Sequence, residues 1–123
     1  MKLHESGENY LETILMLKQE KGYVRSIDVA NAMGFSKPSV SRAVGILKSE
    51  GFIVVEKDGN LELTDAGQKR AEKVYERHLL LTDLLHNFLG VSEETAEEDA
   101  CRIEHIISQE TFEKIKEFTK KEK

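Results

Sequence analysis

The stretch SIDVANAMGFSKPSVSRAVGILKSE, residues 26–50, contains two runs of apolar residues at helical spacing with a short turn between them. Ser26 is a typical capping residue for the start of the first helix, and Gly34 is typical of its end. A turn this short lets the first helix brace the second, which is the layout of a helix-turn-helix motif. We therefore predict a helix-turn-helix over this stretch.

The second helix of the motif is predicted to begin with Ser36 as its cap and to stop at Gly51. Pro38 fits the first turn of this helix because its missing N–H would have no partner within the helix there. The buried face is predicted to contain Val40, Ala43, Val44 and Leu47. The opposite face is then available to read a major groove.

A β-hairpin is predicted directly after this helix. Ile53-Val54-Val55 is a β-branched run, Asp58-Gly59 is a two-residue turn signal, and Leu61-Glu62-Leu63 alternates as a return strand. An amphipathic helix over residues 10–17 precedes the motif. Together these elements predict a winged helix-turn-helix.

Helical spacing continues through the rest of the chain, with stretches predicted at residues 64–90, 94–107 and 111–118. The predicted fold class is therefore mostly α, a winged helix-turn-helix with a two-stranded wing followed by a helical dimerisation region. We predict a DNA-binding domain over residues 1–70 and a helical metal-binding and dimerisation domain over residues 71–123.

The composition excludes several classes of protein. The longest apolar runs fall far short of a membrane span, so we expect no membrane partner. The first residues, MKLHESGENY, lack the apolar core of a secretory signal, and the single cysteine, Cys101, agrees with a reducing compartment. We therefore expect a cytoplasmic protein.

The net charge of −5 argues against a generally basic DNA-binding surface, but the charge is unevenly distributed. Residues 36–48 contain Lys37, Arg42 and Lys48 and no acidic residue. We expect Arg42 to read a base edge, although Ser39 and Ser41 are equally well explained by simple solvent exposure. The predicted DNA contacts are Ser36, Lys37, Pro38, Ser39, Ser41 and Arg42.

Three potential metal ligands follow one another at helical spacing in the string CRIEH. Cys101, Glu104 and His105 stand at i, i+3 and i+4, so a thiolate, a carboxylate and an imidazole converge on one side of a helix. Further ligands are expected from Asn9, Glu12 or His78. Two other interpretations stay open: Cys101 as a small buried hydrophobe, and Cys101 with His105 as the nucleophile and base of a hydrolase. No oxyanion-hole loop or phosphate cradle supports the enzyme, so we expect none.

Four strings in this order resemble the diphtheria toxin repressor and manganese transport regulator family of metal-dependent repressors. They are ENYLETI at 8–14, SKPSVSRAV at 36–44, YERH at 75–78 and ACRIEH at 100–105. The resemblance implies a homodimeric winged-helix repressor of metal-uptake genes that binds operator DNA with Fe(II) or Mn(II) as corepressor. It implies metal ligands at Asn9, Glu12, His78, Cys101, Glu104 and His105.

The chain departs from both branches of that family. Asn9 stands where the manganese branch has Asp and the iron branch Met, Cys101 matches the iron branch, and Glu12 matches the manganese branch. We expect a short form without the C-terminal β-domain of the longer members. A thiolate favours Fe(II) over Mn(II), so we expect Fe(II), with Mn(II) close behind.

Dimerisation is predicted from a surplus of apolar residues in the second half. Closure of a monomeric core is the alternative explanation for them. A winged-helix regulator that responds to an organic effector or a redox change, with no metal, is the alternative function. The apolar residues in question are Leu84, Leu85, Phe88, Leu89, Ile103, Ile106 and Ile107.

Overall fold

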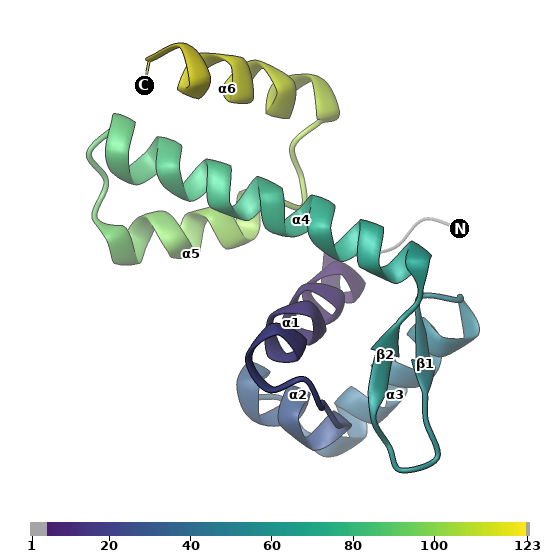
Figure 1. The fold of residues 1–123 in the computed structure, drawn as a ribbon. Coiled ribbons are helices and arrows are strands. Elements are labelled where there is room, and N and C mark those ends of the chain that lie inside the picture. Colours follow the sequence, from purple (N-terminus) through teal and green to yellow (C-terminus); the bar gives the residue numbers. More distant parts are fainter. Residues whose placement is uncertain (1–4, 123) are drawn as a thin grey trace. The chain divides into compact units, whose positions relative to one another are not determined.

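The computed structural model describes residues 5–122 (Figure 1). The chain divides into two compact units, one ending at Glu72 and the other beginning at Lys73. In chain order the elements are α1 (Glu5–Lys21), α2 (Ser26–Met33), α3 (Lys37–Ser49), β1 (Ile53–Val55), β2 (Leu61–Leu63), α4 (Asp65–Asp83), a π-helical turn η1 (Leu84–Phe88), α5 (Glu93–Ile103) and α6 (Gln109–Glu122). Within this described range no helix is long and apolar enough to span a membrane.

The helix-turn-helix is confirmed in the first unit as α2 and α3. Gly34 ends α2 in the left-handed region with φ of 70°, and its N–H donates to Ala30 O at 2.9 Å. Ser36 caps α3, its Oγ accepting from the Ser39 N–H at 3.3 Å. The first helix starts differently from the prediction, because Arg25 is the residue before α2 and its N–H donates to Asp28 Oδ2 at 2.9 Å.

The first unit has one apolar core to which every element contributes. Leu11 and Ile14 of α1, Val40 of α3 and Leu61 of β2 are completely buried. Of the predicted inner face of α3, Val44 and Leu47 are also buried, while Ala43 is only half-buried. This packing fixes α3 through one face and leaves its other face exposed.

The predicted wing is an antiparallel hairpin with Ile53 opposite Leu63 and Val55 opposite Leu61. Its loop is one residue longer than Asp58-Gly59 alone predicts, because the Glu56 N–H donates to Asn60 O and the Gly59 N–H donates to Glu56 O, both at 2.9 Å. A two-residue type I′ turn needs two left-handed residues, whereas in this loop only Gly59 has a positive φ, of 91°.

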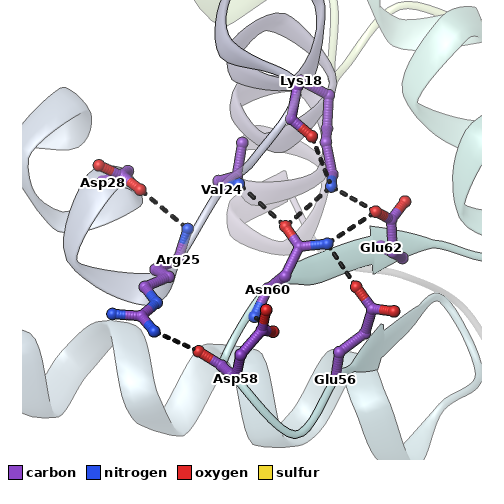
Figure 2. Close-up of polar contacts among 9 residues, drawn as sticks. Lys18, Val24, Arg25, Asp28, Glu56, Asp58, Asn60 and Glu62 are labelled. Atoms are coloured by element: carbon purple, nitrogen blue, oxygen red, sulfur yellow. Dashed lines mark hydrogen bonds and ion pairs between the residues drawn. The ribbon is translucent and has the colours of Figure 1, made fainter.

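A buried amide, Asn60, holds the wing against the rest of the unit, as Figure 2 shows. Asn60 Oδ1 accepts from the Val24 N–H and from Lys18 Nζ, both at 3.0 Å. Its Nδ2 donates to Glu56 Oε1 at 2.5 Å and to Glu62 Oε1 at 2.8 Å. Hydrogen bonds from Lys18 and Asn60 lower the pKa of Glu62 below its ordinary value of 4.5. These contacts therefore stabilise the fold fully above pH 4.5, and the stabilisation is lost as the pH falls through the lowered pKa of the folded state.

The second unit consists of the rest of α4, η1, α5 and α6. The helix predicted to run to Gly90 changes at Leu84 into the π-helical turn η1, where the Leu89 N–H donates to Leu84 O at 3.0 Å. Ser92 caps α5 through the Thr95 N–H at 3.4 Å. The rings of Phe88 and Phe118 pack with centroids 5.7 Å apart. This packing joins η1 to α6.

We expect Gly67→Ala to destabilise the protein, because a Cβ at Gly67 would stand 2.0 Å from the backbone oxygen of Phe52. The loss should be about 1–3 kcal/mol or more, as for other overpacked sites. Gly45→Ala is the matched control: it is also helical and has open space around the new Cβ, so it should stabilise by about 0.5–1 kcal/mol. Urea unfolding measures both, and equal effects would contradict the close approach.

Asn60→Ala should cost about 1–3 kcal/mol, because it leaves the Val24 N–H and the groups around it without their shared partner. Asn31→Ala, on the exposed surface of α2, is the control and should change the free energy of unfolding little. If both variants unfold at the wild-type urea concentration, Asn60 does not hold the wing.

Candidate functional site

The first candidate site is the exposed N-terminal half of α3. Ser36, Lys37, Pro38, Ser41 and Arg42 are exposed and Ser39 is half-buried. All six predicted DNA-contacting residues therefore lie at the start of α3 or in its first half, and most of them are open to solvent. The Ser36 hydroxyl also donates to Ser39 Oγ at 2.9 Å. Two of the hydroxyls are thus already engaged in capping the helix.

The charge on this surface is positive. Lys37, Arg42 and Lys48 lie on α3, which contains no acidic residue. The next acidic residue, Glu50, follows the helix as its C-terminal cap. Attraction to a phosphate backbone acts over roughly 8–10 Å at physiological salt, so this local charge matters more than the net charge of the chain.

The second candidate site is a group of metal-binding side chains in the second unit. His78 of α4, Cys101 of α5 and Glu104, the residue that ends α5, have ligand atoms within 4.8 Å of one another. His78 Nδ1 lies 2.8 Å from Glu104 Oε2. A thiol, an imidazole and a carboxylate from two helices therefore converge, as the sequence predicts for Cys101 and Glu104.

Glu104 is the most constrained member of this group, since its side chain is completely buried. His78 bonds one carboxylate oxygen, whereas the other, Oε1, has no hydrogen-bond partner in the described chain. Its neighbour there is His105 Nε2, at 3.3 Å. A buried carboxylate that lacks a full set of partners is costly, and a divalent cation would satisfy it. The donor set therefore fits a metal ion.

His105 contacts the carboxylate of Glu104, but it lies in a turn and not in the helix that was predicted. The helix predicted over residues 94–107 ends at Ile103, and the next residues form a turn in which the Ile107 N–H donates to Ile103 O at 3.2 Å. Glu104 keeps a helical backbone, with φ of −58° and ψ of −24°, so it still stands one turn after Cys101.

Glu97, which was not among the predicted ligands, lies beside His78. Its Oε1 lies 3.7 Å from His78 Nε2, and its side chain is 64% exposed. Glu97 precedes Cys101 by four residues, so helical spacing places both on one face of α5. That spacing was the available signal. Glu97 also belongs to a run of acidic residues, Glu93, Glu94, Glu97, Glu98 and Asp99, which is more simply explained as a solvated helix face.

Asn9 and Glu12, the two remaining predicted ligands, lie on α1 in the first unit. They are three residues apart and therefore share a face of that helix. Glu12 is buried at 6% exposure, and Asn9 is half-buried. Buried acidic side chains are uncommon in proteins unless they are paired.

Comparison with protein families matches both halves of the chain. Residues 2–61 match the iron dependent repressor N-terminal DNA binding domain. Residues 64–123 match the iron dependent repressor metal binding and dimerisation domain. The helix-turn-helix and β1 lie within the first match, and His78, Cys101 and Glu104 lie within the second.

Individual relatives agree with these matches. The HTH-type transcriptional regulator MntR of Geobacillus kaustophilus is 38% identical over 110 residues, which are 89% of this chain and 77% of that protein. An uncharacterized HTH-type transcriptional regulator of Methanocaldococcus jannaschii is 31% identical over 97% of this chain and 96% of its own length. The solved structure of the manganese regulator SloR has a TM-score of 0.83 and 28% identity over 98% of this chain, which spans 55% of the SloR chain.

Proposed function

The chain belongs to the iron-dependent repressor family of metal-dependent transcriptional regulators, and from that premise we propose that it represses metal-uptake genes by binding operator DNA with Fe(II) or Mn(II) as corepressor. The observation that carries the proposal is the buried carboxylate of Glu104 beside His78 and Cys101, in a chain whose other unit is a winged helix. We further propose that the protein acts in the cytoplasm as a regulator and not as an enzyme.

We propose that the metal is held by His78, Cys101, Glu104 and His105 of the second unit, together with Asn9 and Glu12 of α1. The first four are supported by their grouping around Glu104. Asn9 and Glu12 are supported by their residue types, their shared helix face and the burial of Glu12. A bound divalent cation would supply a partner for the carboxylate oxygen that has no hydrogen bond in the described chain.

The metal preference follows from the donor types. A thiolate from Cys101 raises affinity for Fe(II), Co(II), Ni(II) and Zn(II) relative to Mn(II). Carboxylates from Glu12 and Glu104 suit Mn(II) as well. We therefore propose Fe(II) first and Mn(II) second.

We propose that two copies of the chain pair through the second unit. Leu89 and Ile106 of the predicted dimerisation surface are 64% and 73% exposed, and Leu79 and Phe118 are also exposed in the same unit. A symmetric dimer formed through this unit would cover these side chains. Two α3 helices on successive major grooves would then be about 34 Å apart.

Metal would control DNA binding if one ion were bound by ligand residues of both units. Asn9 and Glu12 lie on the helix that packs beside α2 and α3 in the first unit, and Cys101 and Glu104 lie in the second. Ligands from both units would restrict the orientations open to α3 and favour those that fit an operator.

The metal test is retention of fragments from a genomic DNA pool by the purified protein, under anaerobic conditions, with Fe(II), Mn(II), Zn(II) or a chelator. We expect specific fragments to be retained with Fe(II) or Mn(II) only. Glu104→Gln should lose this stimulation at least tenfold, whereas Glu98→Gln, exposed on α5, should keep it. Equal retention with chelator would favour an organic effector or redox signal, and no retention at all would overturn the DNA-binding role.

Arg42→Ala should weaken binding to the preferred operator by about 1–3 kcal/mol if Arg42 reads a base edge. Arg102→Ala, exposed in the second unit, is the control and should leave operator affinity unchanged. Fluorescence anisotropy with operator and scrambled duplexes measures the difference. An equal loss on both duplexes would assign Arg42 to the phosphate backbone.

A further inference from the structure

Arg77, the residue before His78 on α4, binds the segment that carries two of the proposed metal ligands. Its Nη1 donates to the backbone oxygen of Glu104 at 3.2 Å and to that of Ile107 at 3.0 Å. Its Nη2 donates to Gln109 Oε1 at 3.0 Å. One guanidinium therefore spans the turn that follows α5 and reaches the first residue of α6.

The end of α5 needs such a donor. The last carbonyl groups of a helix have no partner within it and carry its partial negative charge. Here the turn after Ile103 uses its own N–H groups on Arg102 O and Ile103 O. The carbonyls of Glu104 and Ile107 lie beyond these bonds, and the Arg77 cation supplies both with a charged donor.

Glu104 is consequently held at both ends by neighbouring residues of α4. Arg77 bonds its backbone oxygen, and His78 Nδ1 lies 2.8 Å from its carboxylate. The backbone position of Glu104 sets the position of its carboxylate, and the conformation of the turn sets the position of the His105 ring. The position of two ligands thus depends on a side chain outside the ligand set.

The ring of Phe112 holds the guanidinium in place. The Arg77 guanidinium carbon lies 5.4 Å from the centroid of this buried ring, and Lys116 Nζ lies 5.9 Å from it. A planar fork that stacks on a ring and bonds three acceptors is a geometry that lysine does not reproduce.

We propose that Arg77 is a positioning residue of the metal centre, which fixes the Glu104–Ile107 turn so that Glu104 and His105 present their ligand atoms together. This proposal rests on the proposed metal-binding function. Residues that orient metal ligands without touching the metal typically account for about 10–100-fold in metal affinity.

The experiment compares wild type, Arg77→Lys and the matched control Arg102→Lys, with Co(II) as the probe. Anaerobic titration follows the thiolate-to-Co(II) and ligand-field absorption bands, which report affinity and coordination, and circular dichroism of the metal-free proteins reports folding. We expect Arg77→Lys to fold, to bind Co(II) at least tenfold more weakly and to show shifted ligand-field bands. Arg102→Lys, exposed on α5, should match wild type.

Wild-type affinity and bands in Arg77→Lys would overturn the positioning role while leaving the metal site intact. No Co(II) binding by wild type would instead contradict the proposed function, and the positioning role with it. If Arg77→Lys fails to fold, Gln109→Leu removes one of the three hydrogen bonds and keeps the cation. That variant should bind Co(II) a few-fold more weakly with shifted bands, and unchanged binding would overturn the proposal.

Discussion

The carboxylate of Glu104, buried inside a small helical unit, is the constraint on which the organisation of the second half of the chain depends. A charged group in such a position needs hydrogen bonds and an opposite charge, or it destabilises the fold. His78 supplies a partner for one oxygen, and His105 stands beside the other. Both are groups that bind metal ions, so the residues that relieve the burial of Glu104 are also those that would share a cation with it.

The first unit meets a similar constraint in a different way. Asn60 is buried too, but both its donor hydrogens and its acceptor oxygen are bonded by residues of the same unit. A satisfied buried amide fixes one arrangement and needs no ligand. Asn60 is thus satisfied within its own unit, whereas Glu104 Oε1 has no hydrogen-bond partner in the described chain, which is why we propose a ligand role for Glu104 and not for Asn60.

Local sequence signals account for most of the fold and about half of the candidate site. The caps Ser36 and Ser92, the end of α2 at Gly34 and the spacing of Cys101 and Glu104 act over three or four residues, so they are readable from the sequence. The contacts that were not predicted join residues far apart in the chain. Asn60 reaches Lys18, and Arg77 reaches Glu104 and Ile107, through side-chain directions that no local pattern encodes. α5 also ends at Ile103, earlier than predicted, and the carbonyl oxygens of Glu104 and Ile107 in the turn that follows accept from Arg77.

If the proposed ligands hold the metal, their donor types explain why one site would suit two metals. Glu104, which is buried, requires positive charge whatever the ion, whereas Cys101, which is exposed, adds a preference for softer ions without enclosing them. The proposed site would thus select strongly for a positive ion and only weakly among the divalent metals. Because intrinsic affinity rises from Mn(II) to Fe(II) and further to Zn(II), a site of this kind depends on ligand geometry and on metal availability for its selectivity. The backbone turn that sets the positions of Glu104 and His105 is therefore where selectivity among these ions would be decided.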